Sequence, residues 1–221
     1  IQPSEFVKPV IAMYFAMLIE KAPTNLKRFM GNVPYLAVLA VILLLMLLET
    51  HLSGAIVIAG IAIMVLHFGG MPLKPMVIAA IVAVPIVVAI VYFASPVRWA
   101  RITSFINPFA DMQDKGYQIS QAIYAIGSGK IFGLGLGQSI QKYSYLPEPY
   151  NDFIFAIICE ELGMAGAIVV MLLFLALIMR GIKIALNAPD IYGTLTALGI
   201  VSQLAIQTVL NLAVATSTIP N

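Results

Sequence analysis

The sequence predicts an all-α fold, a polytopic transmembrane helix bundle with a large extracellular loop that carries short surface helices. Of the 221 residues, 61% are hydrophobic and only 10% are charged, whereas soluble domains usually contain about 25% charged residues. The apolar residues gather in six runs, and one stretch, residues 95–151, is too long for an ordinary connection. We therefore expect a single membrane domain over residues 1–221, with 95–151 as its extracellular loop.

The six apolar runs are the candidate membrane spans. A helix needs about 20 residues to cross a hydrocarbon core of roughly 30 Å, and fewer where the bilayer thins. The first and third runs are short by this measure, and the other four approach or exceed the required length. The runs cover residues 6–19, 33–48, 54–68, 76–94, 153–179 and 191–215.

The positive charges of the connections predict the orientation of these spans, because lysine and arginine in short loops resist translocation. Every second connection is basic, which places the same face in the cytoplasm each time. Both chain ends and residues 95–151 then lie outside. The sequence starts without a methionine and stops without a closing element, so we expect an internal fragment of a longer membrane protein. The basic residues follow the first, third and fifth runs: Lys21, Lys27 and Arg28; Lys74; Arg180 and Lys183.

Within the extracellular segment, GYQISQAIYAIGSG (residues 116–129) places Tyr117, Ile119, Ala122, Ile123 and Ile126 at three- and four-residue spacings. This pattern predicts a helix that lies along the membrane surface. The following GLGLGQS predicts a compact, turn-rich loop. The glycine cluster GSGKIFGLGLG (residues 127–137) is not a nucleotide-binding loop, because Lys130 is followed by Ile131 rather than by serine or threonine. We interpret its glycines as permitting close packing of the backbone.

Several function classes are excluded by composition. The net charge is only +2, and no basic tract is longer than Lys27-Arg28, so nucleic-acid binding is not expected. The single cysteine, Cys159, has no partner for a disulfide or a Cys-x-x-Cys metal site. We interpret it as a packing residue.

Asp152 is the leading candidate for a functional residue, because it directly precedes the fifth apolar run in LPEPYNDFIF. An aspartate there can also simply cap a helix N-terminus. Glu5 and Lys8 favour the functional interpretation, because they lie one turn apart on the same predicted outer side and such a pair is costly near a membrane. Glu49 and His51 follow the second run on that side.

Two further groups of ionisable residues have competing interpretations. Glu160 and Glu161 lie about two turns beyond Asp152, and we expect a buried polar pair satisfied by neighbouring helices rather than catalytic acids. The extracellular segment has more cations than acids, which favours either a phosphorylated headgroup or a solvated surface. Its cations are Arg98, Arg101, Lys115, Lys130 and Lys142, and its acids are Asp111, Asp114 and Glu148.

Taken together, the motifs QPSEFVK, RITSFINPFAD, GYQISQAIYAIGSG, GLGLGQSIQKYSYLPEPYNDFIFAIICEELG and APDIYG resemble the SEDS family (shape, elongation, division and sporulation). The motifs GLGQSIQK and NPFAD resemble those of its FtsW/SpoVE branch. The resemblance implies part of a roughly ten-span peptidoglycan glycosyltransferase of the cytoplasmic membrane, with its active face outside, for division or sporulation. It also implies that lipid II is the substrate and that a class B penicillin-binding transpeptidase is the partner.

The resemblance further implies roles for individual residues. Asp152 would be the essential acidic residue of the extracellular loop, with Glu5 and Lys8 as a functional pair. For the implied reaction we assign the role of general base to Asp152. We expect Lys8, Arg101 or Lys142, or a divalent cation such as Mg²⁺ or Mn²⁺, to neutralise the departing diphosphate, and Glu148 to support the site. Two departures are Asn151, where the family often has threonine, and Glu49, in a stretch where it often has aspartate. A lipid II flippase and a non-catalytic scaffold that recruits a transpeptidase remain the alternatives.

Overall fold

In the computed structural model, every element of regular structure among the described residues is helical. The chain divides into two compact units. Unit 1 contains residues 1–85 and 176–207, and unit 2 contains residues 86–175 and 208–221. The structure describes residues 3–22, 26, 29–48, 52–94, 117–144 and 153–219.

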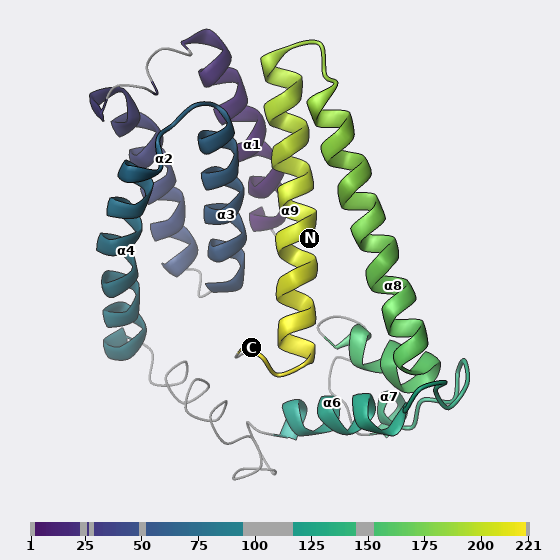
Figure 1. Cartoon of the computed structure of the whole chain (residues 1–221). Helices are drawn as coiled ribbons and strands as arrows, with labels where there is room; N and C mark the ends of the chain where they lie inside the picture. The colour runs from purple at the N-terminus through teal and green to yellow at the C-terminus, as the bar shows by residue number, and fades with distance from the viewer. Residues whose placement is uncertain are drawn as a thin grey trace. The chain divides into compact units, whose positions relative to one another are not determined.

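Each of the six predicted spans is a helix (Figure 1). Within the described residues, three helices are long and apolar enough to cross a membrane: α2 from Met30, α8 and α9. Of the others, α3 has only 17 residues, and α1 carries charged residues near both ends. The bounds are α1 Pro3–Lys21, α2 Phe29–Leu48, α3 Leu52–Phe68, α4 Leu73–Ala94, α6 Tyr117–Ser128, α7 Gln141–Ser144, α8 Ile154–Leu186 and α9 Ile191–Ala215.

Unit 1 is built around the contacts of α3 with α1 and α2, and the first part of α9 packs against α1 and α3. The missing side chain of Gly199 on α9 lets that helix approach Ala12 of α1 and Val65 of α3, since a Cβ there would lie 2.5 Å from Ala12. Gly60 of α3 makes similar room for Ile206 of α9. Small residues of this kind let membrane helices pack closely.

The core of unit 1 is apolar. Phe15 of α1 is fully buried, and its ring meets Tyr35 of α2 edge-on at a centroid distance of 5.9 Å. On α3, Ile58 and Ile61 are buried on the side that faces the other helices. These aromatic and branched side chains fix the register of α1 against α2 and α3.

Unit 2 contains α6, which confirms the helix predicted from the spacing of Tyr117, Ile119, Ala122, Ile123 and Ile126. Its buried face differs in part from the predicted one: Ala125 is buried, whereas Ile123 is only half-buried. Ala122 and Ala125 pack with Phe153, Ala156 and Ile157 at the start of α8, and Ile126 and Val214 cover this cluster. The small side chains of α6 let it lie close to α8, which explains why alanines face the core.

Helix α8 extends past the predicted end of the fifth span at residue 179, so Arg180 and Lys183 lie on the helix rather than in a connection. The helix ends only at Leu186, where the side-chain amide of Asn187 donates a hydrogen bond to the Lys183 carbonyl at 2.6 Å. Pro189 follows and cannot continue a helix. Lys183 lies in the last turn of α8, where a positive charge interacts favourably with the negative end of the helix dipole.

Candidate functional site

Glu5 and Lys8 form an ion pair near the start of α1, with Lys8 Nζ 2.6 Å from Glu5 Oε1. The Lys8 side chain is only 4% exposed, whereas that of Glu5 is 53% exposed. The helical spacing of three residues places both side chains on one face. A buried ammonium needs such a partner, because an isolated charge away from water is costly.

In unit 2, α8 is interrupted one third of the way along. Gly163 adopts φ 68° and ψ −171°, which is not helical. A break of this kind leaves backbone N–H and C=O groups without partners inside the helix. We call residues 129–140, which replace these partners, the glycine loop.

The glycine loop contacts the break on both sides. The N–H groups of Leu134 and Gly135 donate to the carbonyls of Glu160 and Glu161, at 2.9 and 3.0 Å. In the other direction, the N–H groups of Met164 and Ala165 donate to the carbonyls of Lys130 and Ile131, at 2.9 and 3.1 Å. The loop thus supplies the hydrogen bonds that the helix loses at the break.

Glycine is required where the two backbones meet. A Cβ at Gly129 would lie 1.8 Å from the Cys159 carbonyl oxygen, and one at Gly133 would lie 2.2 Å from the Glu161 carbonyl oxygen. A Cβ at Gly163 would lie 2.4 Å from the Gly133 nitrogen. Gly133 and Gly163 also have positive φ angles, which glycine adopts at little cost. The predicted role in close backbone packing is therefore confirmed for Gly129 and Gly133, whereas a Cβ at Gly137 would meet open space.

The carboxylates of Glu160 and Glu161 accept hydrogen bonds from the C-terminal part of the glycine loop, residues 137–140. Glu160, which is buried, accepts from the Ser139 hydroxyl and from the Ile140 N–H at 3.1 Å. Glu161 accepts from the Gly137 N–H at 3.0 Å and pairs with Lys142 Nζ at 2.7 Å. The expectation of a buried, satisfied carboxylate holds for Glu160, whose partners Ser139 and Ile140 lie on the glycine loop rather than on a neighbouring helix. Glu161 is paired with Lys142 of the short helix α7.

The sequence-predicted site residues fall into three groups. Glu5 and Lys8 meet in unit 1, and Lys142 meets Glu161 in unit 2. Among the described residues, no group of three His, Cys, Asp or Glu side chains gathers in a way that could hold a metal ion. Four predicted residues lie outside the described residues: Asp152, Arg101, Glu49 and Glu148.

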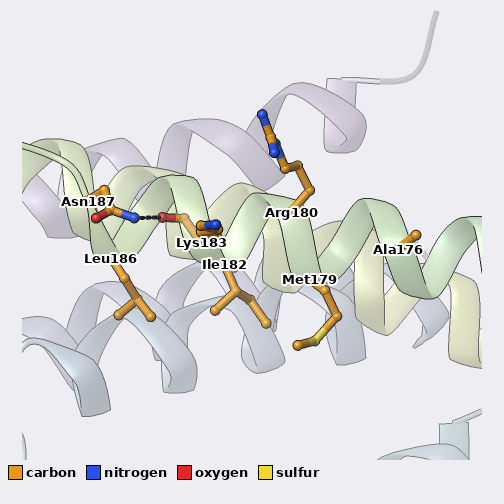
Figure 2. Close-up of a pocket in the computed structure, with 7 residues that line it drawn as sticks. All are labelled: Ala176, Met179, Arg180, Ile182, Lys183, Leu186 and Asn187. Atoms are coloured by element: carbon orange, nitrogen blue, oxygen red, sulfur yellow. Dashed lines mark hydrogen bonds between the residues drawn. The ribbon is translucent and has the colours of Figure 1, made fainter.

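A shallow hollow of about 460 Å³ lies on α8 near its C-terminal end. Figure 2 shows Arg180 pointing to the opposite side of the helix from Met179, Ile182 and Leu186. Arg180 lies 17 helical residues after Gly163, which corresponds to roughly 25 Å along the axis. The hollow is therefore separate from the contacts around the break.

The comparisons with known proteins decide the family. The model of the cell cycle protein family of FtsW, RodA and SpoVE matches residues 1–221. The chain belongs to this family. Its relatives include stage V sporulation protein E of Bacillus subtilis, which is 42% identical over 221 residues, covering 100% of this chain and 60% of the relative.

Two relatives in the FtsW/RodA/SpoVE family carry the name probable peptidoglycan glycosyltransferase FtsW. The one from Trichlorobacter lovleyi is 40% identical over 100% of this chain and 58% of its own length. The one from Nitrosomonas europaea is 39% identical over 99% of this chain and 57% of its own length. The chain therefore spans about 60% of the curated relatives that it matches.

A solved structure shares the fold. The match has a TM-score of 0.79 at 22% identity and covers 100% of this chain and 61% of that chain. That work describes the structural coordination of polymerization and crosslinking by a peptidoglycan synthase complex. The all-α membrane fold predicted from the sequence is thus confirmed.

Sequence reasoning missed Ser139 and Gly163. Ser139 joins the two carboxylates to the loop, since its hydroxyl donates to Glu160 and its N–H donates to Glu161 at 3.4 Å. Gly163 follows Glu-Glu-Leu inside an apolar run, where a glycine is often tolerated in a continuous membrane helix. The useful signal was the pair of carboxylates, because two adjacent acids in such a run require partners from elsewhere.

Proposed function

We propose that this chain is the larger part of a peptidoglycan glycosyltransferase that polymerises lipid II at the outer face of the cytoplasmic membrane. The observation that carries the proposal is the match of the whole chain to relatives named as probable peptidoglycan glycosyltransferases. The relative named for sporulation supports a role in either division or spore cortex synthesis. In this proposal residues 1–221 form one membrane domain, with 95–151 as its extracellular loop.

The reaction joins two lipid-linked sugars. The 4-hydroxyl of an acceptor GlcNAc attacks the anomeric carbon of the donor, a C–O bond forms, and the bond to the polyprenyl diphosphate breaks. Asp152 is the proposed general base that takes the hydroxyl proton, which typically contributes ~10²- to 10⁴-fold to a rate. Its place just before an apolar helix suits a reaction between two headgroups whose prenyl tails stay in the lipid.

The departing diphosphate needs positive charge. Lys8 is the proposed principal source, and its contact with Glu5 supports this role because a partly exposed carboxylate can orient a buried ammonium. Lys142 is a second candidate cation, and its ion pair with Glu161 is the counterpart of the Lys8–Glu5 pair. Arg101 is a further cation, and Glu49 and Glu148 are proposed supporting acids. A divalent cation could supply the same charge, and loss of activity on chelation would indicate it.

The test uses the full-length protein, reconstituted with a class B penicillin-binding transpeptidase as the proposed partner. Labelled lipid II is added, and glycan strands are resolved by gel electrophoresis. Polymer that forms with a transpeptidase-inactive partner supports the proposal. Transbilayer movement of lipid II without any polymer would instead indicate a flippase, and neither activity would indicate a scaffold.

A further inference from the structure

The glycine loop carries an unusual number of exposed apolar side chains. Phe132 is 84% exposed, Leu136 is 76% exposed, and Ile131 and Ile140 are each 60% exposed. Leu134 is exposed as well. Leaving this many large apolar groups in water is unfavourable, because burial of apolar surface is what stabilises it. A contiguous exposed patch of this kind marks an interaction surface.

The backbone of the same loop is satisfied from within the protein. The N–H groups of Gly133, Leu134 and Gly135 donate to carbonyls of the protein. Those of Gly137, Ser139 and Ile140 donate to the carboxylates of Glu160 and Glu161. Irregular backbone can enter the hydrocarbon region of a bilayer only where its polar groups already have partners. The loop meets this requirement at these six positions.

The apolar surface of the loop is also continuous with a lipid-facing surface. The loop is hydrogen-bonded to α8 at Met164 and Ala165, and exposed apolar side chains of α8 follow from that point, with Met164, Ile168 and Leu172. α8 is one of the helices long and apolar enough to cross a membrane. Figure 1 shows the loop beside the same end of α8 as α6 and α7.

We propose that the glycine loop inserts its apolar side chains, led by Phe132 and Leu136, into the lipid leaflet that surrounds the start of α8. The occupant of the surface is lipid, because the surface extends the lipid-facing side of a membrane span and its N–H groups have internal partners. Lys130, which is exposed at the root of the loop, reaches the headgroup phosphates at that depth. The inference does not depend on the glycosyltransferase activity.

The test places tryptophan in the loop of the full-length protein. The background carries Trp99→Phe, the single tryptophan of this sequence, and the same replacement at any tryptophan elsewhere in the protein. Phe132→Trp and Leu136→Trp are then compared in vesicles that contain phospholipids spin-labelled at carbon 5 or carbon 12 of the acyl chain. We expect at least twofold quenching at both positions, stronger with the carbon 5 label because the loop lies near the interface.

Two variants calibrate the measurement. Leu172→Trp lies on the exposed apolar side of α8 and should be quenched by the deeper label. Pro189→Trp lies in the turn between α8 and α9 and should be quenched by neither. If the tryptophans at positions 132 and 136 are quenched as little as the tryptophan at position 189, the proposal is overturned. Their fluorescence would then distinguish exposure to water from cover by protein, since only protein shifts the emission to the blue.

Discussion

Replacing Gly133 with alanine is expected to release the glycine loop from α8. The new Cβ would lie 2.2 Å from the Glu161 carbonyl oxygen and 2.7 Å from the Gly163 nitrogen. Both neighbours are backbone atoms, which cannot rotate away as a side chain could. The loop must therefore move, and the hydrogen bonds from Leu134 and Gly135 to α8 are lost.

The magnitude follows from two costs. Alanine at the Gly133 φ of +77° costs roughly 1–2 kcal/mol. The two hydrogen bonds contribute about 1 kcal/mol each. Together they predict a loss of about 3–4 kcal/mol in the free energy of loop opening, which raises the open population by roughly 10²- to 10³-fold, at about 1.4 kcal/mol for each factor of ten.

Cys159 provides the assay, because it is buried at 6% exposure and its carbonyl packs against Gly129 of the loop. Full-length protein in nanodiscs is treated with a membrane-permeant maleimide, and the peptide that carries Cys159 is quantified by mass spectrometry. When opening is fast relative to alkylation, the rate of modification is proportional to the open population. Gly133→Ala should therefore increase the rate of Cys159 modification by the same roughly 10²- to 10³-fold as the open population.

Two glycines of the same region serve as matched controls. Gly137 has φ +79° but open space at its Cβ, so Gly137→Ala should cost only roughly 1–2 kcal/mol, a factor of about 5–30. Gly127 lies in α6 with open space and an ordinary φ, so Gly127→Ala should be neutral or slightly stabilising. Equal rates for the 133 and 137 variants would refute the steric argument.

Further predictions concern the two ion pairs. Lys142→Met and Glu161→Gln should each lower the free energy of loop opening, measured by Cys159 modification, by about 1–3 kcal/mol. The double variant should lose less than the sum of the two single losses, because neither charge is then left without its partner. Additive losses would show that the two groups act independently. In the polymerisation assay, Lys8→Met should lower the rate at least tenfold and Glu5→Gln should lower it less, since Glu5 is half exposed. Lys21→Met, at the exposed C-terminal end of α1, is the control and should retain activity.

Hydrophobic patterning was sufficient to predict the helices of the described residues, except the four-residue α7. Each apolar run became a helix, and the spacing of Ile119, Ala122 and Ile126 indicated α6 correctly. The spacing did not reveal which of these side chains would be buried most deeply. That outcome depends on Phe153 and Ala156, which pack against α6 from a distant part of the sequence.

The break in α8 could not be predicted from local sequence. Gly163 leaves the helix only because Lys130 and Ile131, more than thirty residues earlier, accept the hydrogen bonds of Met164 and Ala165. Likewise, the partners of Glu160 lie on a loop whose glycines are informative only once the backbone it touches is known. Local propensity determined the helices, and long-range backbone contacts determined the interruption.

The most direct test of the account is the turnover of lipid II by the full-length protein carrying Asp152→Asn. Asparagine keeps the size of the side chain but cannot accept the sugar proton as a base. The account predicts that polymerisation falls at least 100-fold while photo-crosslinking to lipid II and the protection of Cys159 stay unchanged. Polymer formed at the wild-type rate would contradict it.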